Sequence, residues 1–267
     1  MRILYVAELV GKAGIYALKQ VLPELKKSRN IDFTLVCADG ATGGNGLGRH
    51  HAAYIRKLGA DAITTGERCF YKKDLVADWV PYVLRPHNLG PGLPGAGWRV
   101  FKAPGGGPRV AAAVLLGQYF NRLRVGNPFN ELPPLLEKLR EQSPFVVVDF
   151  HSWASGETRT LFAAAAGLCT AVIGSHNRVQ TADEEVLNGT AVICDAGRTG
   201  SAESVGGTDA AARIREYLTG IPDWTKEAWE GNELQGVLIE ADNRGRALGI
   251  ERIRVPAAGG KPSNSVK

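Results

Sequence analysis

The chain has 267 residues, of which 44% are hydrophobic and 22% charged, with a formal net charge of +5. This length can bury a substantial core, as one large α/β domain or as two smaller ones. No basic cluster is interleaved with aromatic residues, so the sequence does not indicate a nucleic-acid partner. No apolar run is long enough to span a membrane, and no membrane partner is expected.

The first half of the chain alternates strand and helix patterns. Three strand–helix pairs are expected: 2–9 with 14–29, 32–39 with 49–59, and 61–66 with 71–79. A glycine-rich turn at 40–48 joins the second strand to the second helix. This order predicts a mainly parallel sheet with right-handed crossovers.

The second half begins with a hairpin signal, PGGGP at 104–108 between two apolar segments. The helices expected after it cover 131–142, 155–167 and 208–218, and the strands cover 145–150, 170–175, 190–197, 235–242 and 247–255. No linker or internal repeat interrupts the chain, so we expect one domain over residues 1–256. Residues 257–267 have the composition of a disordered tail.

Two further expectations concern assembly and location. The last two strands look antiparallel, and an open edge there favours a homo-oligomer. The chain begins directly with a strand pattern and has no signal-peptide architecture, so we expect a cytoplasmic protein. The four cysteines lack CxxC pairing, which favours buried thiols over a zinc ribbon or a disulfide framework.

Residues able to bind a metal follow five of the expected strands: Glu8, Asp39, Glu67, His151 and His176. In open α/β sheets, ligands bind beyond the carboxyl ends of the strands. A single acid at such a place is more often a helix cap or a loop residue. Three acids and two imidazoles at five separate strand ends favour a shared polar site. The nucleotide-binding, nucleophile-elbow and HExxH signatures are absent.

Several motifs occur in an order and spacing that resemble the YmdB-like family of calcineurin-type metallophosphoesterases. They are VGKAG, ATGG after Asp39, LRPHNLGPGLPGAGWRVF, NPF at 127–129, VDFHSWASGE, GSHNRVQTADE and DAGRTGSAESVGG. The resemblance covers nearly the whole chain. It implies an α/β fold, a metallophosphoesterase-like sandwich of two mixed β-sheets flanked by helices. It also implies ancestry in the hydrolysis of phosphodiesters, including cyclic nucleotides.

The family's chemistry needs two metals and a histidine near the leaving oxygen, and here this chain departs from the pattern. Glu8 stands where the family has aspartate, and Asp39-Gly40 stands where it has Glu-Asn. The family's Gly-Asn-His reads Gly66-Glu67-Arg68, which puts Arg68 at the catalytic histidine position. The family's His-x-His reads His176-Asn177-Arg178, so Arg178 replaces a metal ligand.

The resemblance therefore implies that the two-metal site is lost. Asp39, Glu67, His151 and His176, with Glu8 as a further candidate, would hold at most one divalent metal (Mn, Fe or Zn), or none. We expect Arg68, Arg178 and Asn177 to form a substrate-binding or salt-bridge network, in which the guanidinium groups replace positive charge that the metals would bring. Arginine stays protonated, so Arg68 cannot act as the general acid.

Three functions remain open on the sequence. The first is a pseudoenzyme that binds a protein partner or a phosphate-containing small molecule without two-metal hydrolysis. The alternative is an active, metal-dependent phosphodiesterase, for cyclic nucleotides among others, with a remodelled and mononuclear site. The third is a salt-bridge network that only stabilises the fold. We rank them in this order, because Arg68 and Arg178 are each hard to reconcile with two-metal chemistry.

Overall fold

The computed structural model describes residues 1–119, 121, 123–223 and 227–258. Its strands form two mixed β-sheets, as the family resemblance implies. The first sheet has the order β2-β12-β13-β1-β3-β4-β5, with β14 paired to β13, and the second has the order β10-β11-β9-β8-β7-β6. Residues 259–267, most of the predicted tail, lie outside the described residues.

The bounds of the elements are as follows. The first sheet contains β1 (Arg2–Val6), β2 (Glu8–Leu9), β3 (Phe33–Cys37), β4 (Ala62–Thr64), β5 (Val83–Leu84), β12 (Arg198–Ser201), β13 (Asn232–Ala241) and β14 (Ala247–Pro256). The second contains β6 (Trp98–Lys102), β7 (Arg109–Leu116), β8 (Phe145–His151), β9 (Ala171–Ser175), β10 (Glu185–Leu187) and β11 (Thr190–Ile193). The helices are α1 (Gly11–Ser28), α2 (Arg49–Lys57), α3 (Lys73–Ala77), α4 (Pro128–Arg140), α5 (Ser155–Ala165) and α6 (Ala210–Thr219).

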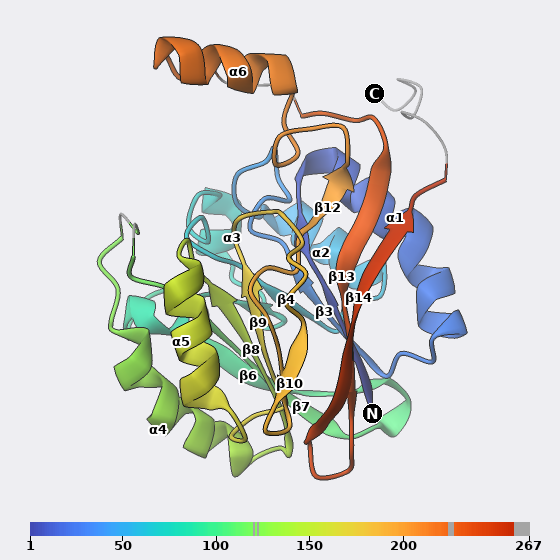
Figure 1. The fold of residues 1–267 in the computed structure, drawn as a ribbon, viewed down its shortest axis with the longest axis vertical. Coiled ribbons are helices and arrows are strands. Elements are labelled where there is room, and N and C mark those ends of the chain that lie inside the picture. The colour runs from blue at the N-terminus through green and yellow to red at the C-terminus, as the bar shows by residue number, and fades with distance from the viewer. Residues whose placement is uncertain (120, 122, 224–226, 259–267) are drawn as a thin grey trace.

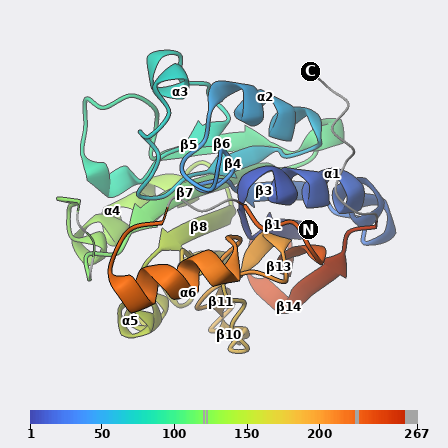
Figure 2. The same ribbon diagram turned by 90° about the horizontal axis from the view of Figure 1, so that it is seen from above.

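The two sheets pack face to face, and five of the described helices, α1 to α5, cover their outer faces. Side chains that alternate along each strand fill the layer between the sheets, with Ile3, Tyr5 and Leu35 on one side and Ala112 and Val147 on the other. The helices α1, α2 and α3 pack on the outer face of the first sheet, and α4 and α5 pack on the outer face of the second. Figure 2 shows this layering from above.

The strands β1, β3, β4 and β5 run parallel, as expected for the β-α-β-α-β start, and so do β7, β8, β9 and β11. The predicted hairpin joins β6 to β7 in antiparallel register. Parallel strands end at the same edge of a sheet, so the residues after β1, β3 and β4 lie together, as do those after β8 and β9. The candidate site lies at these carboxyl ends of strands from both sheets (Figure 1).

Some elements differ from the sequence pattern. The short strands β10 and β12 carry no apolar run and are strands only because a neighbouring strand supplies their hydrogen bonds. Helix α4 begins at Pro128, earlier than predicted, because the side chain of Asn127 accepts a hydrogen bond from the Phe129 N–H at 2.9 Å and caps the helix. Among the described residues, no helix combines the length and the apolar character that crossing a membrane requires.

Candidate metal centre

The structure brings the five predicted residues together at the carboxyl ends of strands from both sheets. Glu8 starts β2 directly after β1, Asp39 follows β3, and Glu67 follows β4. His151 is the last residue of β8, and His176 comes directly after β9. Glu8, Asp39 and His151 are fully buried, so the cluster lies at the floor of the site.

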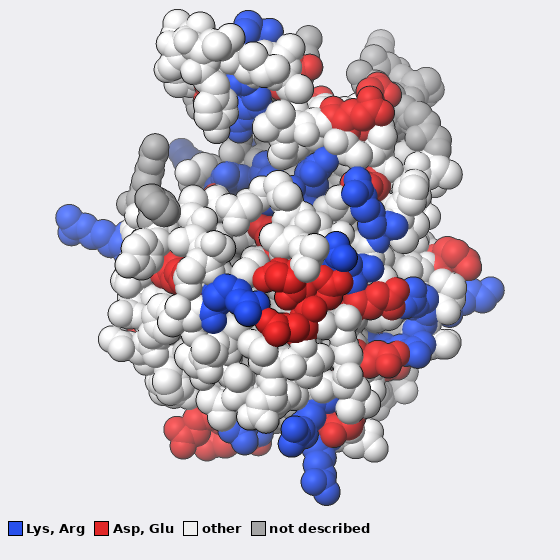
Figure 3. Space-filling view, in the orientation of Figure 1, with Lys and Arg blue, Asp and Glu red and all other residues white. Residues whose placement is uncertain are grey.

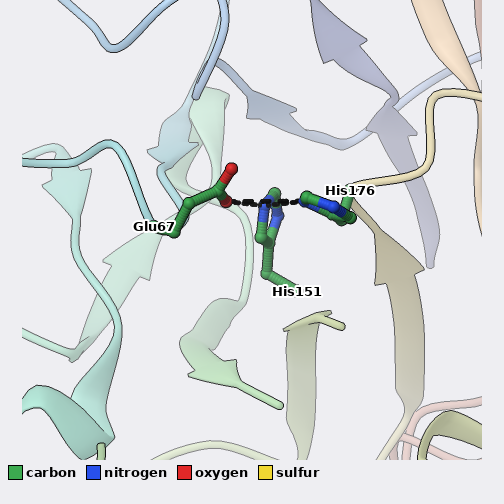
Figure 4. A group of neighbouring side chains, drawn as sticks. All are labelled: Glu67, His151 and His176. Carbon is green, nitrogen blue, oxygen red and sulfur yellow. Dashed lines mark hydrogen bonds and ion pairs between the residues drawn. The ribbon is translucent and has the colours of Figure 1, made fainter. Parts of the chain in front are cut away.

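Three of these residues form a group with the donor atoms of a metal site, shown in Figure 4: Glu67, His151 and His176. One ligand atom from each lies within 4.8 Å of the other two. Nδ1 of His176 lies 3.2 Å from Nε2 of His151 and 3.6 Å from Oε2 of Glu67, and this Glu67 oxygen also contacts Nε2 of His151.

The same Glu67 oxygen is buried and faces ring nitrogens of both histidines. Donor atoms of one carboxylate and two imidazoles that converge in this way have the arrangement of a cation-binding group. A set of one carboxylate and two imidazoles suits zinc, iron or manganese, so these residues fit one divalent metal.

Buried partners orient His151 for this role. Ser175 donates its hydroxyl proton to Oδ1 of Asp149 at 2.7 Å, so its oxygen is free to accept from Nδ1–H of His151 at 2.9 Å. The other oxygen of Asp149 accepts hydrogen bonds from Tyr5, at 2.8 Å, and from Thr64. These contacts turn Nε2 of His151 toward Glu67 and hold it there, as outer partners of metal-bound histidines do.

The loop that carries His176 is held in an uncommon backbone conformation. His176 has a φ of 113° and Arg178 a φ of 61°, values that residues other than glycine seldom adopt. The indole of Trp153 lies 4.2 Å from the His176 ring, centre to centre. The N–H of Asn177 donates to Asp195 at 2.7 Å. These contacts fix the direction of the His176 imidazole.

Asp39 lies beside the three-residue group. Its Oδ1 accepts from the N–H of Gly66 at 2.6 Å and of Arg68 at 3.2 Å, and its Oδ2 is 4.0 Å from Nε2 of His151. Burial and the nearby charge of Glu67 raise the pKa of Asp39 to about 7. In this geometry Asp39 holds the loop between Gly66 and Arg68 in place.

Glu8 is paired with Arg178. Nε and Nη2 of the guanidinium donate to one Glu8 oxygen at 3.1 and 2.7 Å, and the remaining donors reach the carbonyls of Gly206 at 3.0 Å and Gly44 at 3.2 Å. Burial favours the neutral carboxyl, but the charge and hydrogen bonds of Arg178 outweigh it and lower the pKa of Glu8. Arg178 therefore fills the space beside Glu8 with a fixed positive charge.

Gly40 makes room for this pair. A Cβ atom at residue 40 would lie 2.6 Å from Nη2 of Arg178 and 2.8 Å from Oε1 of Glu8, closer than atoms can pack. The family resemblance places asparagine at this position, and any side chain there would collide with the guanidinium. The glycine thus leaves the space that the Arg178 guanidinium occupies.

Arg68 is bound more loosely than Arg178. Its Nη2 lies 3.1 Å from Glu67, while its Nη1 lies 3.4 Å from the Gly44 carbonyl and 3.9 Å from Glu8. Its side chain is 22% exposed, so the guanidinium reaches solvent. It lines a cavity of about 470 Å³ that extends from the Gly43–Gly44 turn to α6. Asn177, the third member of the predicted network, donates instead to the Ser152 carbonyl at 3.4 Å.

Sequence reasoning missed the partners that hold the histidines, namely Asp149, Ser175, Trp153 and Asp195. One signal was available for Asp149, because it stands two residues before His151 within an apolar strand and so points to the same face. Ser175 and Asp195 come close to the site through β9 and the segment after β11, and Trp153 through the segment between β8 and α5.

The sandwich of two mixed sheets, with carboxylates and imidazoles at the strand ends, defines a metallophosphoesterase-like fold. The family described as "YmdB-like protein" matches residues 4–253, and the chain belongs to this family.

Three similar proteins illustrate the family. The 2',3'-cyclic-nucleotide 2'-phosphodiesterase of Bacillus subtilis (strain 168) is 34% identical over 259 residues, covering 96% of this chain and 97% of its own length. The crystal structure of a phosphatase from Mycoplasma pneumoniae superposes with a TM-score of 0.89 at 27% identity and covers 98% of this chain and 95% of its own. A protein of Thermus thermophilus, titled hypothetical, has the same TM-score and identity, with coverage of 97% and 100%.

Proposed function

We propose that the protein is a metal-dependent phosphodiesterase with a remodelled, mononuclear site. The observation that carries the proposal is the group of Glu67, His151 and His176, whose donor atoms all lie within 4.8 Å of one another. The name of the Bacillus subtilis relative supports a cyclic phosphodiester as the substrate class. Of the functions that the sequence leaves open, this is the active phosphodiesterase, which ranks second, and not the pseudoenzyme, which ranks first.

The protein residues would divide the work as follows. Glu67, His151 and His176 would hold the metal, which supplies a Lewis acid and an activated water when bound. Arg68 is partly exposed and makes long contacts at Nη1. Its guanidinium can therefore turn to donate hydrogen bonds to a phosphate oxygen and stabilise the negative charge on it. Arg178 has its donors engaged by Glu8 and two carbonyls, so its role is to replace the positive charge of a second metal.

Arg68 stands where the family resemblance places the histidine that would donate a proton, and a guanidinium is not a general acid. We therefore expect the rate to depend steeply on the leaving group, because the departing oxygen must take its proton from water. An aryl diester such as bis(p-nitrophenyl) phosphate should be cleaved faster than an alkyl diester of similar size. Equal rates for the two would contradict this assignment of Arg68.

The test combines metal content with hydrolysis. Protein purified without chelator should carry about one equivalent of metal per chain, by elemental mass spectrometry, and should hydrolyse a 2',3'-cyclic nucleotide. His176→Gln should lower metal affinity at least tenfold, because replacing even a hydrogen-bond partner of a metal ligand costs about 10- to 100-fold. His87→Gln is the matched control, because His87 is half-buried, pairs with Glu131 and is not one of the grouped residues.

A second candidate function is a binding protein without hydrolysis. The buried Arg178–Glu8 pair favours it, because it removes one acid from metal binding. Protein that stays free of metal after incubation with manganese, iron and zinc, and that hydrolyses neither substrate, would establish this second function in place of the first. About two metals per chain would contradict both.

A further inference from the structure

A polar cavity of about 410 Å³ lies on the other side of the loop that carries His176 and Arg178. Its lining consists of Val179, Gln180, Arg198, Gln235, Arg252 and Arg254. The loop thus presents His176 and Arg178 to the candidate metal centre and the next two residues to this cavity. The proposed function uses none of the cavity's residues.

Two of the arginines project from one face of the exposed strand β14. Arg252 and Arg254 are two residues apart, so their side chains point the same way, and Arg254 lies opposite Gln235 of β13. In Figure 3, basic and acidic side chains lie side by side over the part of the molecule where β12 and β14 are drawn in Figure 1. The Nε atoms of Arg252 and Arg254 donate to Glu184 and Glu233, at 2.7 and 2.6 Å. Their terminal amino groups make no hydrogen bond to a described residue.

The third arginine, Arg198, carries a positive charge that no carboxylate of the described chain neutralises by an ion pair. Its guanidinium is half-buried and donates to the carbonyls of Ser201 at 2.9 Å, Ala202 at 3.0 Å and Arg178 at 3.3 Å. Burial and the charge of Arg254 lower the pKa of Arg198, against the opposing effect of Glu233. Three arginines thus face two glutamates around one cavity, which leaves an excess of positive charge there.

We propose that this cavity is a second anion-binding site, which takes the dianionic phosphate group of a small molecule. Guanidinium forks match the oxygen geometry of phosphate, and an anion with three terminal oxygens can accept from several forks at once. The volume exceeds that of a single phosphate, so the rest of the molecule has space above Gln180 and Val179. The proposal rests on residues outside the metal centre and does not depend on hydrolysis.

An anion held here would also bear on the metal-centre loop. Arg198 lines the cavity and also donates a hydrogen bond to the carbonyl of Arg178. The φ of Arg178 is 61°, an uncommon conformation that depends on such surrounding contacts. A bound phosphate that accepts hydrogen bonds from Arg198 would compete with the Arg178 carbonyl for this guanidinium. It would thereby change how firmly Arg178 is held against Glu8.

The experiment is a titration with inorganic phosphate by calorimetry, at constant ionic strength set with chloride. We expect saturable binding at or below about 1 mM. Arg254→Gln should weaken it at least tenfold, because hydrogen bonds between charged groups are removed. The matched control is Arg29→Gln, because Arg29 pairs with Glu251 of the same strand but does not line the cavity. Arg252→Gln repeats the test if the Arg254 variant does not fold.

Hydrogen-exchange mass spectrometry then locates the bound phosphate. The proposal expects phosphate to slow exchange in peptides covering 177–182 and 250–256, with or without a further change over 40–70, where Arg68 lies. Protection confined to 40–70 would place phosphate beside Arg68 and overturn the second site. Absence of saturable binding, or equal affinity in Arg254→Gln and wild type, would overturn it as well. These outcomes leave the metal and hydrolysis measurements of the proposed function untouched.

Discussion

Replacing Arg178 by methionine is the most direct test of how the rearranged site is held together. Glu8 is 1% exposed and Arg178 8% exposed, and the substitution removes two hydrogen bonds to the Glu8 carboxylate together with those to two carbonyls. Removing one partner of a buried ion pair leaves an uncompensated charge and costs about 3–5 kcal/mol. At roughly 2–4 °C per kcal/mol for a chain of this size, Tm should fall by roughly 6–20 °C.

The assay is thermal and urea unfolding of the single variants and of the double variant Glu8→Leu/Arg178→Met. The double variant should regain most of the lost stability, because it leaves no buried charge without a partner. Arg29→Met serves as the control: it removes an ion pair in which both side chains are partly exposed, and should cost less than about 1 kcal/mol. The reasoning is refuted if Arg178→Met costs no more than Arg29→Met, or if the double variant is less stable than the single one.

Three further predictions concern neighbouring residues. Gly40→Ala should destabilise the protein by about 1–3 kcal/mol in urea unfolding, because its Cβ would meet the Arg178 guanidinium at 2.6 Å. Asp149→Asn should weaken metal binding by about 10- to 100-fold in a competition assay, because it disturbs the serine that orients His151. Burial raises the pKa of Asp195 to about 7, so the folded chain keeps a proton that the unfolded chain releases near pH 4, and stability should fall as pH rises from about 4 to 7. Asp195→Asn should flatten that slope when Tm is measured at about pH 5 and about pH 7.5.

Each of these has an outcome that contradicts it. Gly40→Ala with full stability would mean that the arginine moves freely away from Glu8. For Asp149→Asn, unchanged metal affinity with a changed Tm would limit the residue to a structural role. A pH slope as steep in Asp195→Asn as in the wild type would assign the titration to other buried groups, such as Asp39.

Much of the fold and part of the candidate site follow from local patterns in the sequence. The alternation of apolar strands and amphipathic helices predicted the parallel start, and the PGGGP turn predicted the β6–β7 hairpin, because side-chain periodicity records which face of each element is buried. The same pattern placed Glu8 and Asp39 together, because parallel strands of one sheet end at a common edge, whereas His151 ends a strand of the second sheet and meets them through the packing of the two sheets. The strands β10 and β12 left no such signal, because they are short and partly polar.

The tertiary structure alone decided which charges pair. Glu8 and Arg178 are 170 residues apart in the chain, and only the packing of the two sheets brings them together. No local pattern indicated that Glu67, and not Asp39, would share its group with both histidines, since the distinction depends on backbone N–H groups of residues 66 and 68 that engage Asp39. Side-chain periodicity records burial, whereas the pairing of buried charges depends on distances between elements that the sequence does not encode locally.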